Sequence, residues 1–264
     1  MSNERGAEAR IRAAIAGGKA FIPFVTCGDP DIETTERLVL AMAQAGADLI
    51  ELGIPFSDPM AEGPVIQDAD TRALASGTDT DKVFELVERL RTKTDVPFAF
   101  MTYANVVFSQ GIERFAERMA QVGVEALILP DVPLEEREEF AGPCREAGVV
   151  LISMVAPTSH ERVRAIAKTA EGFVYCVSSL GVTGVRSSIT ADVAGLVALV
   201  KEVRPDIPCA IGFGISTPEQ ARTMAQVADG VIVGSAIVRQ VDELGRACVE
   251  PVAAYVRQMK AALG

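Results

Sequence analysis

The amino-acid sequence predicts an α/β protein, a (β/α)8 barrel, and two observations lead to this prediction. Eight short runs of apolar, often β-branched residues alternate with amphipathic segments along the 264 residues. The runs are continuously apolar, as are parallel strands that are covered on both faces. This strict alternation, without a break in composition, favours one barrel domain over residues 1–264 rather than a doubly wound sheet.

The order of the elements follows from where each apolar run begins and ends. The expected strands span residues 20–27, 48–54, 97–103, 125–132, 149–156, 172–179, 209–214 and 230–238. The expected helices between them span residues 34–45, 81–91, 112–122, 135–147, 161–170, 191–203 and 218–227. Gly46, Gly123 and Gly148 follow amphipathic segments, at the position where glycine commonly ends a helix. An extra N-terminal helix at residues 4–15 is expected to plug the bottom of the barrel.

Two connections are longer than the others and follow the second and the sixth expected strand. They contain residues 57–77 and 180–190. Both lie at the carboxyl ends of strands, which is the face where barrel enzymes carry their active sites. Long loops in compact domains are commonly lids or binding loops. The sequence therefore places the functional site at this face.

The overall charge and the absence of special segments exclude several classes of function. The formal net charge is −11 and no block of Lys or Arg interrupts it, so we expect no binding to nucleic acid or to anionic membranes. No apolar run has the length of a membrane span, and the charged N-terminus does not resemble a signal peptide. The five cysteines lack CxxC spacing, which is typical of reduced core residues. These features predict a cytoplasmic protein.

The most informative residue is Glu51, which interrupts the apolar run of the second expected strand. A buried carboxyl group is costly unless it has a partner or a function, and burial raises its pKa. Such a group can donate and accept protons near neutrality. Glu51 is therefore a candidate catalytic residue, and the alternative is a structural carboxylate that is paired inside the barrel.

Two glycine-rich segments predict a phosphate site. GFGIST (212–217) and GSAIV (234–238) lie at the ends of the seventh and eighth expected strands. Small residues let an anion approach backbone N–H groups, and Ser235 adds a hydroxyl group. Barrels often bind phosphate at these two positions. The alternative is that the glycines only end strands.

Further candidate residues lie in loops and at strand ends. Glu62 lies in the long loop after the second strand, either reaching the mouth of the barrel or remaining a solvated charge. Asp131 lies at the end of the fourth expected strand. It is either a substrate ligand or the cap of a helix near Pro133. Tyr103 and Tyr175 end the third and sixth, where they line the mouth or pack in the core. Thr183 lies between glycines that permit a hinged lid, or in a mobile surface loop.

Several kinds of chemistry are disfavoured by what the sequence lacks. The single histidine, His160, begins an expected helix and should be solvated, so we expect neither a His-based triad nor a multi-His metal centre. No lysine lies in an expected strand, which argues against a Schiff-base mechanism. What remains is carboxylate catalysis on a phosphorylated substrate, whose apolar part would meet side chains such as Phe24 and Phe213.

Seven motifs, in order and spacing, resemble the tryptophan synthase alpha subunit family over nearly the whole chain. They are FIPFVTCGDPD (21–31), ELGIPFSDPMAEGPVIQ (51–67), MTYANVVFSQGIERF (101–115), LPDVPLEE (129–136), SSLGVTGVR (178–186), GFGIS (212–216) and GSAIV (234–238). The resemblance implies a TIM barrel that cleaves indole-3-glycerol phosphate to indole and glyceraldehyde 3-phosphate, without a cofactor of its own. It also implies an alpha2beta2 assembly with a beta subunit, whose pyridoxal phosphate serves to join the indole to serine.

The resemblance also assigns roles to residues. Glu51 matches the general acid and base of the retro-aldol cleavage, and Glu62 matches a loop carboxylate that holds the indole N–H group. The family usually has Asp at this loop position, so Glu62 extends the reach by one methylene group. Many members also carry Arg before the GVTG lid, where this chain has SSLGVTG. Thr183 is the lid residue that meets the loop carboxylate. We assign other substrate contacts to Phe24, Tyr103, Asp131, Tyr175 and Phe213, and phosphate contacts to Gly184, Gly214, Gly234 and Ser235.

Apolar residues in the loops of the same face predict a docking surface for the partner. Pro55, Phe56, Pro59, Met60 and residues 106–108 supply the apolar side chains. Asp58 and Asn105 match family positions near the beta subunit. The expected interface residues are Pro55, Asp58, Pro59, Asn105 and Phe108. The alternative is that the apolar side chains fold inward and the chain is a free monomer.

Two other functions remain open at this point. One is another phosphate-binding barrel, such as an isomerase or epimerase of a sugar phosphate, which the apolar mouth, the lack of a catalytic histidine and the ordered motifs disfavour. The other is a non-catalytic barrel that only activates a partner enzyme, which the presence of Glu51 disfavours.

Overall fold

Parallel strands form a barrel in the computed structural model, which describes residues 4–177, 186–212 and 214–264. The strands are β1 (Ala20–Thr26), β2 (Ile50–Gly53), β3 (Phe98–Met101), β4 (Ala126–Ile128), β5 (Val150–Leu151), β6 (Ser153–Val155), β7 (Val174–Val177), β8 (Cys209–Gly212) and β9 (Gly230–Val233). Their order is β5-β4-β3-β2-β1-β9-β8-β7-β6, and every neighbouring pair is parallel. The strands at the two ends of this order, β5 and β6, are separated by Ile152 alone, so the chain itself closes the barrel. The predicted barrel is confirmed.

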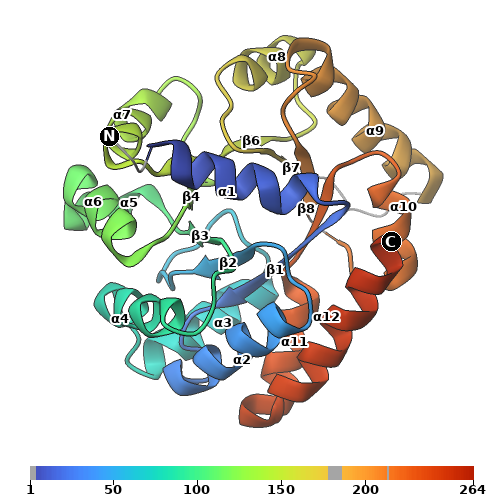
Figure 1. Cartoon of the computed structure of the whole chain (residues 1–264). Helices are drawn as coiled ribbons and strands as arrows, with labels where there is room; N and C mark the ends of the chain where they lie inside the picture. Colours follow the sequence, from blue (N-terminus) through green and yellow to red (C-terminus); the bar gives the residue numbers. More distant parts are fainter. Residues whose placement is uncertain (1–3, 178–185, 213) are drawn as a thin grey trace.

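Helices surround this barrel as an outer layer (Figure 1). They are α1 (Glu4–Ala16), α2 (Ile32–Gln44), α3 (Pro64–Ala75), α4 (Thr80–Arg91), α5 (Ala104–Gln110), α6 (Ile112–Val122), α7 (Arg137–Ala147), α8 (His160–Lys168), α9 (Arg186–Val203), α10 (Pro218–Ala225), α11 (Ser235–Leu244), the 3-10 turn η1 (Gly245–Ala247) and α12 (Val249–Leu263). Gly123 and Gly148 end α6 and α7 with φ angles of 82° and 78°, as their positions in the sequence predict.

Each strand separates two hydrophobic cores. Along β1, Phe21 and Val25 belong to the core between the sheet and the helices, whereas Ile22 and Phe24 belong to the core inside the barrel. All seven residues of β1 are buried as a result. This two-sided burial is the reason that the strands appear in the sequence as continuous apolar runs.

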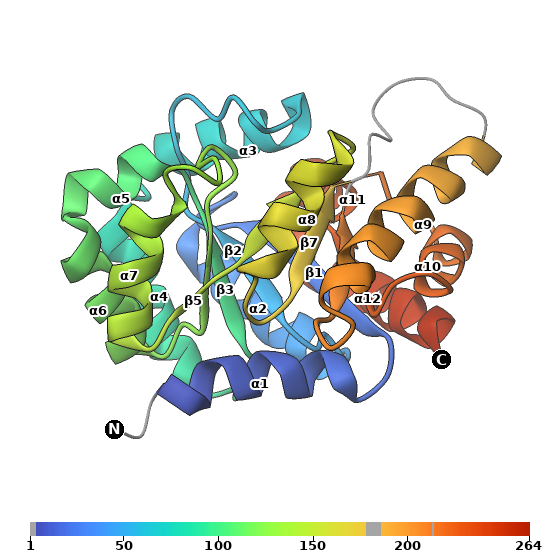
Figure 2. The same cartoon turned by 90° about the horizontal axis from the view of Figure 1, so that it is seen from above.

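Helix α1 closes the end of the barrel opposite to α3, as Figure 2 shows. Its Ile11 and Ile15 are buried in the inner core together with Phe173. Its Arg10 pairs with the buried Glu125 at 2.8 Å, and Arg91 of α4 pairs with the same carboxylate at 2.7 Å. The predicted plug is confirmed.

The structure corrects the sequence-based bounds at several elements. The eighth expected strand, 230–238, is wrong in its second half, because β9 ends at Val233 and Ser235 begins α11. The fifth expected strand is split into β5 and β6. Residues 64–75 of the long connection form α3, which begins with a proline, and residues 104–110 form α5. Short apolar runs do not distinguish a strand from the first turn of a buried helix, which explains the error at 235–238.

Tyr103 and Tyr175 are not at the ends of strands, where the sequence led us to expect them. Tyr103 comes after β3 and precedes α5, whereas Tyr175 lies within β7. All five cysteines are free and buried, and His160 is exposed at the start of α8, as predicted.

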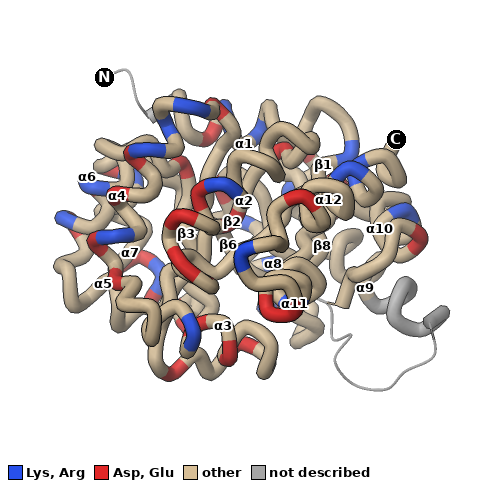
Figure 3. Tube along the Cα trace, turned by 90° about the horizontal axis from the view of Figure 1, so that it is seen from below, with Lys and Arg blue, Asp and Glu red and all other residues tan. Residues whose placement is uncertain are grey.

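Charged residues are mixed over the molecule. Figure 3 shows Lys and Arg scattered among Asp and Glu along the helices. Of the helices in the described ranges, none has the length and apolar character needed to cross a membrane.

Candidate active site

A cavity of about 470 Å³ lies at the carboxyl ends of the strands, on the face predicted from the two long connections. This volume is typical of small-molecule sites. Strands β1, β2, β3, β7 and β9 supply one part of its wall, and the starts of α3 and α11 supply another. Seven of the residues assigned to the substrate site from the sequence line it: Phe24, Glu51, Glu62, Tyr175, Gly214, Gly234 and Ser235.

Glu51 lies within β2, between Phe24 of β1 and Ala99 of β3 in the strand register. Its side chain has no exposed surface, and both carboxyl oxygens lack a hydrogen-bond partner within the described ranges. Burial raises the pKa of Glu51 well above its ordinary value, and the nearby charge of Glu62 raises it further. Within the described residues, the structure thus places a carboxyl group with a raised pKa and no hydrogen-bond partner against the cavity.

Glu62 approaches the same cavity from the turn that precedes α3. It is half-buried, and burial raises its pKa to about 7. The hydroxyl oxygen of Tyr103 accepts a hydrogen bond from the Ala61 N–H at 2.9 Å, and the Tyr103 ring stacks on Phe56 with ring centres 5.2 Å apart. Tyr103 is not part of the cavity wall, so its substrate contact stays a prediction. In the structure it fixes the turn that carries Glu62.

The start of α11 forms the polar end of the cavity. Gly234 precedes the helix, no side chain caps its N-terminus, and Ser235 and Ala236 line the cavity. The first N–H groups of a helix have no partner within the helix, and they attract anions. Gly214, whose φ of 73° suits glycine, lines the same end.

Arg239 adds a positive charge to this end of the cavity, and it was not a candidate from the sequence. It is four residues after Ser235 and therefore on the same face of α11. This spacing is the signal that would have found it, once residues 235–244 are recognised as a helix.

Two glycines inside strands make room for the aromatic rings of the cavity. A Cβ atom on Gly53 would lie 2.6 Å from the Phe24 ring, and one on Gly212 would lie 2.5 Å from the Tyr175 ring. These close approaches require glycine, and they hold Phe24 and Tyr175 against the cavity.

Asp131 lies apart from the cavity wall. It is exposed, and its two carboxylate oxygens accept hydrogen bonds from the Ala104 N–H, both at 3.1 Å. Asp131 therefore caps the start of α5. The capping alternative is correct in kind, but the sequence suggested a helix near Pro133 and not α5. Thr183, Gly184 and Phe213 lie outside the described residues.

The expected docking loops are only partly exposed. Asp58 and Asn105 are exposed, as are Met60 (91%) and Phe108 (47%). Pro55 and Pro59 are buried, so the exposure expected for them is wrong. Their interface role stays a prediction.

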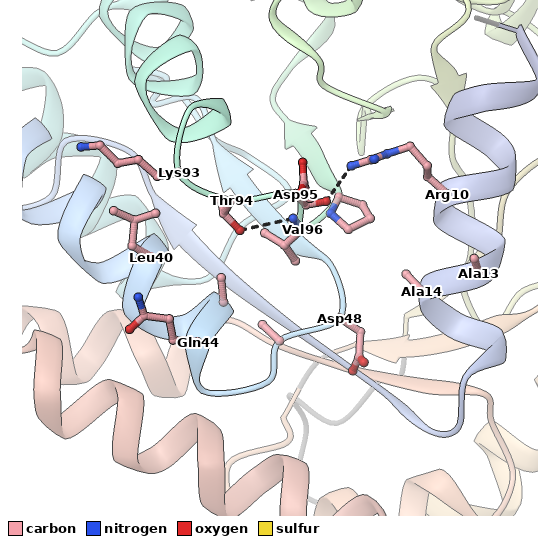
Figure 4. A pocket seen from close by; sticks show the side chains of 13 residues that line it. Arg10, Ala13, Ala14, Leu40, Gln44, Asp48, Lys93, Thr94, Asp95 and Val96 are labelled. Carbon is pink, nitrogen blue, oxygen red and sulfur yellow. Dashed lines mark hydrogen bonds between the residues drawn. The ribbon is translucent and has the colours of Figure 1, made fainter.

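A larger cavity, of about 530 Å³, lies at the opposite end of the barrel beside α1 (Figure 4). Three of its charged side chains have partners within the protein: Arg10 donates to the Asp95 carbonyl at 2.6 Å, Lys93 pairs with Glu36 at 2.6 Å, and Asp48 pairs with Lys260 at 2.6 Å. Among the described residues that line it there is neither a buried acid without a partner nor a helix N-terminus. The described residues also contain no group of His, Cys, Asp and Glu side chains that could hold a metal ion.

Comparisons with known proteins agree with this arrangement. The model of the family "Tryptophan synthase alpha chain" matches residues 12–263. The tryptophan synthase alpha chain of Lacticaseibacillus casei is 48% identical over 245 residues, which are 93% of this chain and 92% of that protein.

Two solved structures extend the comparison to the fold. The tryptophan synthase subunit alpha of Legionella pneumophila str. Paris is 34% identical with a TM-score of 0.86, over 100% of this chain and 98% of the other. A chain from the tryptophan synthase alpha2beta2 complex of Pyrococcus furiosus is 35% identical with a TM-score of 0.86, over 92% of this chain and 98% of the other. The chain belongs to the tryptophan synthase alpha chain family.

Proposed function

We propose that Glu51 and Glu62 cleave indole-3-glycerol phosphate in the cavity at the carboxyl ends of the strands. As a member of its family the chain is a lyase, and the products are indole and glyceraldehyde 3-phosphate. The observation that carries the assignment of residues is the burial of Glu51 against the cavity without a hydrogen-bond partner within the described ranges.

Glu51 begins the reaction as the acid, because burial raises its pKa and so favours its protonated form. It donates its proton to C3 of the indole ring, which then carries a positive charge shared with the ring nitrogen. The carboxylate of Glu62 accepts a hydrogen bond from the indole N–H group and stabilises this charge.

The carbon–carbon bond then breaks in a retro-aldol step. Glu51, now a carboxylate, removes the proton from the hydroxyl group on the side-chain carbon next to the ring. The C–O bond becomes a carbonyl, and the electron pair of the C–C bond returns to the ring and restores its aromaticity. Indole and glyceraldehyde 3-phosphate leave, and Glu51 is protonated again, ready for the next substrate.

Substrate orientation follows from the two ends of the cavity. The N-terminus of α11, with Ser235, Gly234, Gly214 and the charge of Arg239, would hold the phosphate group. Phe24 and Tyr175 would contact the ring, close to Glu51. The overall charge of −11 opposes an anionic substrate, so this local anion site has to supply the attraction.

We also infer several properties of the protein as a whole. The alpha chain acts without a cofactor of its own and passes indole to a beta subunit, which carries pyridoxal phosphate, in an alpha2beta2 assembly. Residues 1–264 form one domain, since β1 pairs with β9 and α12 packs on α2. The protein functions in the cytoplasm.

The test is indole release from indole-3-glycerol phosphate by Glu51→Gln, measured alone and with a beta subunit. Loss of a positioned acid and base should lower kcat by about 10²- to 10⁴-fold while the KM changes little. Glu88→Gln, which changes an exposed glutamate of α4, is the matched control and should retain full activity. Unchanged turnover in Glu51→Gln would contradict the assignment.

A further inference from the structure

A third cavity lies at the wall of the barrel where β4 and β6 diverge. Strand β5 pairs with β4 through Leu127 and Leu151, whereas β6 pairs with β7. The chain thus changes neighbours at Ile152, and the strand order of the described residues contains no pairing between β4 and β6. A cavity of about 240 Å³ occupies this divergence. In Figure 1, β6 lies between α7 and α8, which flank the same part of the wall.

The cavity has mostly apolar walls. One side is formed by residues that follow β4, namely Leu129, Pro130 and Leu134, and the other by Met154, Val155 and Ile166. Among the described residues, none that lines this cavity also lines the Glu51 cavity. The inference below therefore rests on other side chains than the proposed cleavage does.

Two buried polar side chains of this cavity each have an atom without a hydrogen-bond partner within the described ranges. Arg137, at the start of α7, is only 9% exposed, and its Nη2 donates to the Leu151 carbonyl at 2.7 Å. The Nε of Arg137 and the Oγ of Ser153 are enclosed and have no hydrogen-bond partner within the described ranges. Ser153 itself is 3% exposed. Both residues line the cavity.

No carboxylate of the described residues forms an ion pair with Arg137. The charges of Glu171 and Glu138 act on Arg137, but both side chains form their ion pairs with Arg145, at 3.8 and 3.3 Å. A guanidinium group remains protonated in proteins, and a buried charge without a counter-ion is strongly destabilising. The arrangement would therefore gain stability from an anion in the cavity.

The single positive charge and the apolar walls of the cavity favour one class of anion over others. A single guanidinium balances a single negative charge, and its planar group matches the two oxygens of a carboxylate. A phosphate dianion would leave an excess negative charge among apolar side chains. The volume is below the range usual for drug-sized ligands, so the ligand must be small. We propose that the wall cavity binds a small organic monocarboxylate with an apolar body, held by Arg137 and Ser153.

The rim of the cavity carries an ion pair between neighbouring connections. Arg162 of α8, a lining residue, makes two hydrogen bonds of 2.8 and 2.9 Å to the carboxylate of Glu135, which follows β4.

Benzoate, added to the full-length chain, is the probe for this site. With the methionine methyl groups labelled with 13C, the NMR signal of Met154 reports on the wall cavity and that of Met101 on the Glu51 cavity. Benzoate should shift the Met154 signal in a saturable manner and leave the Met101 signal in place. Benzamide, which is neutral and of the same shape, should bind at least about tenfold more weakly.

Arg137→Gln removes the buried charge and should weaken benzoate binding at least tenfold. Lys168→Gln, which removes an exposed positive charge at the end of α8, should bind benzoate like the unmodified chain. If Arg137→Gln does not fold, the comparison of benzoate with benzamide on the unmodified chain decides alone. The proposal is overturned if benzoate does not shift Met154, if benzamide binds equally well, or if folded Arg137→Gln retains its affinity.

Discussion

Glu51 and Glu62 acquire different acid strengths although they come from one short segment of the chain. Glu51 is enclosed within a strand and has no partner in the described ranges, so its neutral form is strongly favoured. Glu62 lies in a turn, retains part of its contact with water, and has a pKa of about 7. Environments that separate two carboxyl groups in this way assign one the role of acid and the other the role of charged stabiliser.

The pKa of Glu62 leads to a prediction for the pH dependence of cleavage. Only the carboxylate form can accept the indole N–H hydrogen bond with a full charge, and this form is lost as the pH falls below about 7. The kcat/KM should therefore rise with pH up to about 7 and then level off. Rates measured between pH 5 and pH 9 test this.

The variant Glu62→Gln links this pH dependence to one residue. It should be slow and should lack the rise towards pH 7, whereas Glu62→Asp should keep a rise. A rise that persists unchanged in Glu62→Gln would assign the titration to another group, of which the buried Asp70, with its pKa raised to about 7, is the nearest candidate.

At the scale of elements, the N-termini of helices supply backbone N–H groups that are free to bind an anion, whereas the N–H groups of paired strands are used within the sheet. The N-terminus of α11 directs partner-free N–H groups towards the cavity, and Gly234 keeps the approach to them open. An added Cβ at Gly234 would contact the Phe24 side chain at 3.4 Å, which is an ordinary distance, so the fold tolerates a side chain at this position. The same side chain would occupy the space that we assign to the bound anion.

Gly234→Asp should therefore raise the KM for indole-3-glycerol phosphate by at least about 100-fold, because it places a negative charge where the phosphate group would bind. Saturation kinetics and direct titration with inorganic phosphate measure the effect. Gly195→Asp, at an exposed position of α9 with open space around its Cβ, is the control and should bind as before. Normal binding by folded Gly234→Asp would place the phosphate site elsewhere.

Asp131 tests whether a loop carboxylate serves the fold or the substrate. Because it caps α5 from the connection after β4, Asp131→Ala should lower the free energy of unfolding by about 1 kcal/mol. Urea denaturation measures the loss, and Asp131→Asn should recover part of it. If Asp131→Ala raised the KM without a loss of stability, the result would support the substrate contact assigned to Asp131 from the sequence.

At the scale of the whole molecule, one face carries both the cavity and the exposed apolar side chains. Met60 and Phe108 lie in the connections that follow β2 and β3, the strands that also border the Glu51 cavity. A partner that covers these connections would cover the turn of Glu62 as well. Docking of the beta subunit and closure of the active site would therefore involve the same segments.

Met60→Glu should weaken association with the beta subunit at least about tenfold, since it puts a charge on the most exposed apolar side chain of that face. Calorimetric titration of the beta subunit measures the affinity. Leu244→Glu, at the end of α11, is the control, because Leu244 is also exposed (41%). Equal loss in both variants would show a general effect of charge, and unchanged affinity in Met60→Glu would remove this turn from the interface.

Residues with strong local signals were predictable from the sequence. Glu51 was recognisable because it interrupts an apolar run, and Gly234 and Ser235 because small residues follow a strand at a position where barrels bind phosphate. Arg239 was missed because the apolar residues 235–238 look like the end of a strand. Asp131 was misplaced because its partner, the Ala104 N–H, belongs to a different connection.

The sequence alone determined the barrel and the order of its strands, the buried acid, the two glycine-rich ends and the family, because these depend on local patterns of polarity and size. The tertiary structure decided which segments meet: Tyr103 beneath the turn of Glu62, Pro55 and Pro59 folded inward, and Arg137 buried in the barrel wall against the Leu151 carbonyl. The physical reason is that burial and partnership are set by side chains far apart in the sequence, and their packing is not encoded in the pattern of any one segment.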